Sequence, residues 1–213
     1  MIKPEELKEK YLLRQGEILR RLQEFEEKGK GTDAELLAEM AFCISAANSS
    51  AEAAFRAQQE LAETGFLFSD DADAISAILL KSKVRFHKKK AEYLIMTRKK
   101  LFDSGELKRK LSEEEDAHKL RFYLVKEAKG IGYKEAAHYL RNIGRGHDFA
   151  ILDRHIFRNL GSLGVLKRKP KSLTPKKYLA IEKRLRKFSK EAGIPMSHLD
   201  LLFWSEETGR IFK

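Results

Sequence analysis

The chain has 213 residues, of which 42% are hydrophobic. A chain of this kind can bury a core, either as one compact domain or as two small lobes around a cleft, and it is not a disordered tail. Lysine and arginine outnumber aspartate and glutamate by 43 to 32, which gives a net charge of +11. This excess favours a polyanionic partner such as nucleic acid over a merely charged and soluble surface.

Cys43 is the only cysteine of the chain. A disulfide within the chain and a cysteine-rich zinc or iron–sulfur site are therefore excluded. We expect Cys43 to be a buried, inert thiol, because it lies in an apolar stretch. The sequence has no signal peptide and no apolar run of about 18 residues, so we expect a soluble, intracellular protein.

Apolar residues recur at spacings of three and four along the whole chain, and no alternating strand pattern appears, so we predict an all-α fold. The first helix is expected over residues 4–28. Thr32 and Glu35 form a capping-box pattern that opens the second helix. A short break at residues 48–50 separates it from a third helix, which runs to about Gly65.

The next segments alternate cap signals with apolar periodicity. Ser69 precedes an acidic first turn and is predicted to cap a helix. Residues 84–102 are predicted to form one long basic helix. Ser112 and Glu115 form a second capping-box pattern, which predicts a helix from there through Ala128.

Two helical patterns are joined by Gly130-Ile131-Gly132. Glycine allows a positive φ and a close approach of the backbone to a ligand. The amides that begin the second helix could then hold a phosphate oxygen, with Ile131 between the two helices. Taken alone, the pattern fits a simple turn between helices as well as a DNA-binding hairpin.

Lys134 falls in the first turn of the second of these helices. A cation there opposes the helix dipole, and the same field lowers the pKa of a lysine, which an amine nucleophile requires. Asp153 follows nineteen residues later, at the start of another helical pattern. Its residue type suits a helix N-cap, and a carboxylate at the edge of a cleft could also take part in chemistry.

The C-terminal part begins with the basic run at residues 167–171, which we interpret as an exposed linker that could contact phosphate. Thr174-Pro175 predicts a helix start, and that helix should run to Gly193. A last helix is expected over about 196–207, ending near Gly209. The apolar residues just before the terminal Lys213 suggest that the tail is docked.

The hairpin, its lysine and the later Leu-Asp-x-His pattern resemble the helix-hairpin-helix superfamily of base-excision DNA glycosylases that use a lysine nucleophile. The segments 47–50 and 85–92, the absence of iron–sulfur cysteines and the terminal lysine extend the resemblance over nearly the whole chain. Together they are similar to the compact archaeal-type 8-oxoguanine DNA glycosylases, the second family with that activity.

This resemblance implies two helical lobes around a DNA-binding cleft. Residues 1–30 would pack with the C-terminal lobe, residues 31–157 would form the lobe that carries the hairpin, and residues 158–213 would form the C-terminal lobe. The implied partner is double-stranded DNA containing 8-oxoguanine. No cofactor, catalytic metal, membrane or obligate protein partner is implied, a monomer would suffice, and a cytoplasmic, nucleoid-associated prokaryotic location is expected.

The resemblance also implies a role for each matching residue. Lys134 would attack the anomeric carbon of the flipped nucleotide, giving a Schiff base and then strand cleavage by β-elimination. Asp153 would stabilise the positive charge that develops on the sugar and help to keep the amine neutral. Base recognition would fall to Lys213, Trp204 and Phe86. DNA contacts would come from Asn48, Arg85, Lys88, Gly130, Gly132, Arg154, His155 and Arg158.

Several of these residues have ordinary structural interpretations. Asn48 could merely break a helix. Phe86 and Trp204 could be core residues, and a terminal lysine is usually a frayed end. As alternatives for the whole protein, a non-catalytic hairpin module would explain the charge and glycines but not Lys134 with Asp153. A glycosylase for another lesion and, more remotely, a helical RNA-binding protein remain open.

Overall fold

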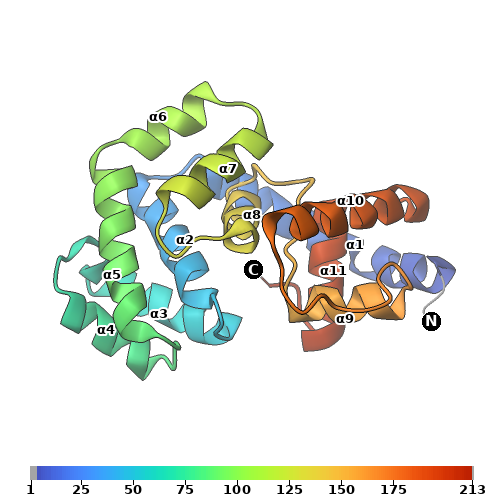
Figure 1. Ribbon diagram of the computed structural model, residues 1–213, viewed down its shortest axis with the longest axis horizontal. Coiled ribbons are helices and arrows are strands. Elements are labelled where there is room, and N and C mark those ends of the chain that lie inside the picture. Colours follow the sequence, from blue (N-terminus) through green and yellow to red (C-terminus); the bar gives the residue numbers. More distant parts are fainter. Residues whose placement is uncertain (1–3, 213) are drawn as a thin grey trace.

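The computed structural model describes residues 4–212, and this part of the chain is helical with no strand, which confirms the predicted all-α class (Figure 1). The helices are α1 (Pro4–Gly29), α2 (Asp33–Ala46), α3 (Ala51–Glu63), α4 (Ala72–Lys81), α5 (His87–Thr97), α6 (Glu106–Glu113), α7 (Ala117–Glu127), α8 (Tyr133–Asn142), α9 (Arg154–Ser162), α10 (Pro175–Ala192) and α11 (Met196–Thr208). Two shorter turns are the 3-10 helix η1 (Phe66–Phe68) and the π-helical η2 (Arg98–Asp103).

Helix boundaries with strong local cap signals are confirmed. The hydroxyl of Thr32 accepts from the amide of Glu35, and the Glu35 carboxylate accepts from the amide of Thr32 at 2.7 Å, so the capping box opens α2. Thr174 caps α10, with proline at the first helical positions, and Gly193 ends it in the left-handed conformation. Each terminus is closed by the residue that its local chemistry favours.

Two predicted helix starts are wrong because a neighbouring aspartate provides the cap. Asp71 caps α4 by accepting from the amide of Ala74, whereas Ser69 accepts from the amide of Asp71 in the turn before it. Ser112 lies in the last turn of α6, and α7 begins after Asp116, whose carboxylate accepts from two amides of its first turn. A carboxylate is a strong cap, and it stabilises the helix dipole as well.

The long basic helix predicted over 84–102 is shorter than expected. Residues 82–86 form a loop, and Phe86 has φ +58°, so α5 begins only at His87. Its far end widens into η2, where the Arg98 guanidinium bonds to Asp103 and to the carbonyl of Ser69. The apolar periodicity continues through both irregularities, which is why it does not reveal them.

The buried apolar residues form two clusters. The first runs from Leu36 to Ile151 and is built mainly by α2–α8. The second combines α1 with residues of the chain from Ala150 to Phe203, in α9, α10 and α11. Figure 1 shows α2–α7 on one side and α9–α11 on the other, with α8 between them. The boundary expected at residues 157–158 falls inside α9, whose buried residues belong to the second cluster.

A buried ion pair joins the two clusters. Arg121 on α7 donates to both carboxylate oxygens of Glu182 on α10, at 2.6 and 3.0 Å, and both side chains are almost fully buried. Glu182 also accepts from the amide of Ala150 at 3.0 Å, and the guanidinium lies 4.1 Å from the centre of the Phe149 ring. Because every partner is present, the pair can hold α7 against α10 without an unpaired buried charge.

Candidate active site

The hairpin between α7 and α8 requires glycine at its first position. Gly130 has φ +78°, and a Cβ at this position would lie 2.5 Å from the ring of Tyr93. Lys129, just before it, donates its amide to the Thr97 hydroxyl at 3.1 Å. Ile131 is buried in the first cluster, as the sequence predicted. The turn is therefore held by Tyr93 and Thr97 of α5, which contact Gly130 and Lys129, and by Ile131, which is buried in the first cluster.

Gly132 has a different reason to be glycine. Its φ is −100°, so of the two hairpin glycines only Gly130 uses the positive φ that glycine allows. The amide of Gly132 donates to the Glu135 carboxylate at 3.3 Å, and a Cβ here would come within 3.1 Å of the same oxygen. The next amides of the first turn of α8 have no acceptor within the helix, which leaves donors for an anion.

Lys134 is the second residue of α8. Its ammonium lies 3.6 Å from the Glu135 carboxylate, and its side chain is 21% exposed. The amine is thus neither buried in the core nor free in solvent. It stands at the N-terminal end of the helix, where the dipole opposes a positive charge.

Asp153 is the N-cap of α9, as its sequence context predicted. One oxygen, Oδ1, accepts from the amides of His155 and Ile156, both at 2.8 Å. The other oxygen, Oδ2, has no hydrogen-bond donor among the residues that the structure describes. The capping role fixes the carboxylate and leaves one oxygen available to a ligand.

Asp200 on α11 is a site residue that sequence reasoning missed. Burial raises the pKa of its carboxyl to about 6; Arg141 and Lys134 act against this rise, while the nearby charge of Asp153 adds to it. Its side chain is only 12% exposed, and Arg141 lies 3.5 Å away. The charges of Lys134 and Asp153 both influence the pKa of this carboxyl, so the fold brings all three groups within electrostatic range of one another. The available signal was an acid between apolar residues in the first half of α11, whose other two acids, Glu206 and Glu207, lie in its last turn.

The start of α9 is tied to the end of α11. The His155 ring packs edge-on against Trp204, with centroids 5.0 Å apart, and its Nδ1 lies 3.6 Å from the Glu207 carboxylate. Arg154 donates to the other ring nitrogen at 3.1 Å, and Arg158 forms an ion pair with Glu207. Sequence reasoning singled out the α9 residues but did not foresee Glu207, which organises them.

The C-terminal tail lies between the two lobes. The Phe212 ring contacts Phe55 on α3 and Trp204 on α11, with centroids 5.4 and 6.4 Å away. Arg210 lies 3.8 Å from Glu52 on α3 and 4.8 Å from the centre of the Phe212 ring. The expectation that the tail is docked is confirmed up to Phe212, and the expected role of Lys213 lies outside the described residues.

The remaining predicted site residues of the first lobe lie on two loops and, for Lys88, in the first turn of α5. Asn48 and Phe86 both have left-handed backbones, with φ +57° and +58°. Phe86 is 60% exposed, so it is not a core residue, and Arg85 stacks on its ring at 5.3 Å. Arg85, Asn48 and Lys88 are also exposed. Trp204 is half-buried, and its indole N–H has no partner in the part of the chain described.

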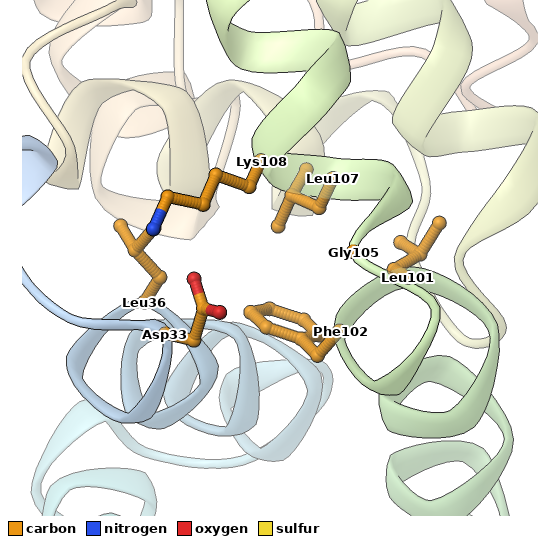
Figure 2. A pocket seen from close by; sticks show the side chains of 7 residues that line it. All are labelled: Asp33, Leu36, Leu101, Phe102, Gly105, Leu107 and Lys108. Atoms are coloured by element: carbon orange, nitrogen blue, oxygen red, sulfur yellow. The ribbon is translucent and has the colours of Figure 1, made fainter.

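A small hollow between α2, η2 and α6 is lined by Asp33, Leu36, Leu101, Phe102, Gly105, Leu107 and Lys108 (Figure 2). It has no room for a water-sized molecule and lies away from Lys134 and Asp153 in the chain. Over residues 4–212 there is no group of three potential metal ligands, and no helix is long and apolar enough to cross a membrane.

The family described as 8-oxoguanine DNA glycosylase matches this chain over residues 18–194, which includes Lys134 and Asp153. The chain belongs to this family. A relative from Fusobacterium nucleatum, named 8-oxoguanine DNA glycosylase/AP lyase, is 40% identical over 91% of this chain and 89% of its own length. A protein of the same name from Korarchaeum cryptofilum is also 40% identical, over 92% of this chain and 90% of its own.

Solved structures of the family agree with this fold. The 8-oxoguanine DNA glycosylase of Thermotoga maritima superimposes with a TM-score of 0.88 at 34% identity, covering 99% of this chain and 98% of its own. The Methanocaldococcus jannaschii glycosylase/lyase, in complex with a 15mer DNA containing 8-oxoguanine, gives 0.86 at 36% identity, with 97% and 99% covered. The fold of this chain is therefore shared with a family member that has been solved in complex with DNA containing 8-oxoguanine.

Proposed function

We propose that this protein is a bifunctional DNA glycosylase and AP lyase that removes 8-oxoguanine from double-stranded DNA. The observation that carries the proposal is Lys134, half-buried at the N-terminal end of the second hairpin helix, with its charge and that of Asp153 both acting on the buried carboxyl of Asp200. A non-catalytic hairpin module has no use for this arrangement. Membership of the 8-oxoguanine DNA glycosylase family supports the choice of lesion.

Lys134 is the nucleophile in this proposal. The lone pair on Nζ attacks C1′ of the extruded nucleotide, the C1′–N9 bond breaks, and the base leaves with that electron pair and takes up a proton. Loss of a proton from the nitrogen and opening of the sugar ring give the Schiff base. Removal of a C2′ proton then breaks the C3′–O3′ bond and cleaves the strand. The amine lies at the N-terminal end of α8, beside the hairpin amides that would hold the phosphate of the same strand.

Asp153 has the charge and position to stabilise the transition state. The sugar becomes electron-poor as the base leaves, and a fixed carboxylate lowers the free energy of that charge. The hydrogen bonds that Oδ1 accepts from two backbone amides hold the Asp153 carboxylate in place, so it needs little reorganisation during the reaction. Asp200, whose pKa lies near 6, adds a second carboxyl whose charge depends on pH in the working range.

The DNA would cross the face that carries the hairpin, the start of α9 and the two loops of the first lobe. Gly130 and Gly132 would present hairpin amides to a phosphate, and Arg154, His155 and Arg158 would contact the strand near the lesion. Arg85 and Lys88 would bind the backbone or the opposite strand, while Asn48 fills the gap left by the base. Because each contact to phosphate releases counterions, binding should weaken as salt rises.

The base pocket would lie between the lobes at Trp204 and Lys213, with Phe86 recognising the lesion by stacking where the damaged base leaves the duplex. Trp204 offers an aromatic face and an indole N–H without a partner among the described residues. The terminal carboxylate of Lys213 could accept from the N–H that 8-oxoguanine carries at position seven and guanine lacks. The enzyme would act as a monomer in the cytoplasm and require no cofactor.

Borohydride trapping tests the proposal. The protein is mixed with a duplex holding one 8-oxoguanine, and borohydride reduces any Schiff base to a stable protein–DNA link. We expect trapping by wild type and by the control Lys126→Gln, an exposed lysine on α7. Lys134→Gln should abolish trapping, and Asp153→Asn should lower its rate at least 100-fold.

Other outcomes would change the assignment. Base release by wild type without trapping would mean that water, not Lys134, attacks the sugar. Release of a different damaged base in preference to 8-oxoguanine would leave the chemistry and overturn the lesion. Binding without release across a panel of lesions would favour a non-catalytic module.

A further inference from the structure

Two exposed loops of the first lobe hold unfavourable backbone conformations. Residues 47–50 link α2 to α3, and residues 82–86 link α4 to α5. Asn48, Lys83 and Phe86 have φ of +57°, +66° and +58°, and they are the only non-glycine residues with positive φ in the described chain. Such conformations persist only where the surroundings hold them, and they gather at ligand-binding sites.

Lys90 on α5 lies beneath both loops and is only 5% exposed. Its ammonium donates to the carbonyl of Ser45 at 2.7 Å, to that of Ala47 at 2.5 Å and to the hydroxyl of Ser49 at 3.2 Å. All three donors of the ammonium are therefore used. The two carbonyls belong to the C-terminal end of α2, where a cation is favourable.

Ser49 connects this anchor to the second loop. Its hydroxyl oxygen also accepts from the backbone amide of Arg85, at 3.0 Å. Asn48 is the residue before Ser49, and Phe86 is the residue after Arg85. Asn48 and Phe86 are therefore each next to a residue of this hydrogen-bond network, and the buried ammonium of Lys90 supports both loops.

The anchor is an unusual use of a lysine. No carboxylate forms an ion pair with Lys90 among the described residues, and burial lowers the pKa of its ammonium to about 8. The charge of Glu135 acts against this shift, while Lys134 and Arg85 add to it. A buried ammonium without an ion pair is unfavourable for folding, and an apolar side chain of similar length would avoid that penalty.

We propose that Lys90 is a positioning residue that holds Asn48 and Phe86 together, so that both enter the duplex in one step when the damaged nucleotide leaves the stack. This proposal rests on the glycosylase function proposed above. Lys90 does not touch the reacting atoms, because its three donors are bound to the loops. It should therefore matter for opening an intact duplex, and much less for cleaving a strand at a site that has already lost its base.

The test compares two substrates under single-turnover conditions. The first is a duplex with 8-oxoguanine, on which excision requires extrusion of the base. The second is the same duplex with a ready-made abasic site, on which only the lyase steps occur. The variants are Lys90→Met, which keeps the length of the side chain, and Ser49→Ala, which removes only the shared acceptor. Lys89→Met, the exposed neighbour on α5, is the control, and Ser49→Thr restores the hydroxyl.

We expect Lys90→Met and Ser49→Ala to slow excision at least tenfold and to change the lyase rate less than threefold. Ser49→Thr and Lys89→Met should stay near wild type on both substrates. The fluorescence of 2-aminopurine beside the lesion should rise more slowly in the impaired variants, because it reports loss of stacking.

Three results would overturn the proposal. Unchanged excision by both impaired variants would mean that the loops do not need the anchor. An equal slowing on both substrates would indicate a folding defect or a change in the charge around Lys134. If wild type fails to excise 8-oxoguanine, the proposed function itself is wrong, and this inference is wrong with it. If only the effect expected for Lys90→Met is absent, wild type is still trapped by borohydride and the proposed function stands.

Discussion

Two arginine–carboxylate pairs with buried arginines connect the lobes of this protein, and they differ in how many hydrogen bonds they form. Arg121 and Glu182 form two hydrogen bonds, and Glu182 accepts a third from the backbone. Arg141 lies 3.5 Å from Asp200, and two of its guanidinium nitrogens, Nε and one terminal nitrogen, are buried without a hydrogen-bond partner among the described residues. The first pair is complete. The second is incomplete, and its Asp200 interacts with both Lys134 and Asp153.

The difference indicates where the molecule is built for stability and where for chemistry. A saturated pair fixes one geometry and cannot take another partner. An unsaturated pair stores an unfavourable electrostatic energy, and such groups gather at functional sites. The contrast can be tested by breaking each pair.

Breaking the complete pair should have the largest effect on folding. Arg121→Met leaves the Glu182 carboxylate buried without its cation, and we expect the free energy of unfolding to fall by about 3–5 kcal/mol. Urea unfolding at pH 7 measures this change. The double variant Arg121→Met/Glu182→Leu, which removes both charges, should restore most of that stability. A decrease below about 1 kcal/mol in the single variant would mean that the lobes are joined mainly by apolar contacts.

Breaking the incomplete pair should change how stability depends on pH. The folded pKa of Asp200 is raised from 3.8 to about 6, so its stabilising contribution is complete below pH 4 and is lost as the pH rises through 6. Relative to Asp200→Asn, wild type should lose roughly 2–3 kcal/mol of unfolding free energy between pH 4 and pH 7. Urea unfolding of both proteins at each pH gives this difference. A constant difference would mean that Asp200 titrates normally.

Exposed cations that form no ion pair among the described residues should have the smallest effect. No acidic residue occurs between Asp153 and Glu182, and the linker carries four exposed cations, Lys167, Arg168, Lys169 and Lys171. Changing all four to glutamine should leave stability unchanged. It should reduce the slope of log Kd against log salt by about 0.9 for each phosphate that the linker neutralises in the wild-type complex.

The matched control for the linker changes four exposed lysines elsewhere, Lys8, Lys99, Lys108 and Lys126, to glutamine. It removes the same net charge, so a purely long-range effect would alter both slopes equally. Equal slopes in the two quadruple variants would exclude a local contact by the linker.

The sequence predicted the features that depend on neighbours along the chain. The Thr32–Glu35 box and the Thr174-Pro175 start are confirmed because a cap acts within one turn. Prediction failed at α4 and α7, where a serine and a nearby aspartate both offered a cap and the aspartate took the role. The left-handed backbone of Phe86 interrupts the helix predicted over 84–102, so α5 begins only after it, and apolar periodicity does not reveal such a conformation.

The candidate site divides in the same way. Lys134 and Asp153 could be singled out because each begins a helix, and that position has known electrostatic consequences. Asp200 and Lys90 could not, because their importance comes from groups that the fold brings to them. The partners of Lys90 lie more than forty residues earlier in the chain, and Asp200 comes near Arg141 and within electrostatic range of Lys134 only through the packing of α11.

One measurement tests the assignment of the nucleophile most directly. After borohydride trapping on 8-oxoguanine duplex, the protein is digested and the peptide carrying the nucleotide is identified by mass spectrometry. We expect the adduct on Lys134 alone. Lys90 is the informative competitor, because its lowered pKa makes its amine easier to deprotonate, yet its donors are bound to the loops. An adduct on Lys90 or on any other lysine would contradict the assignment.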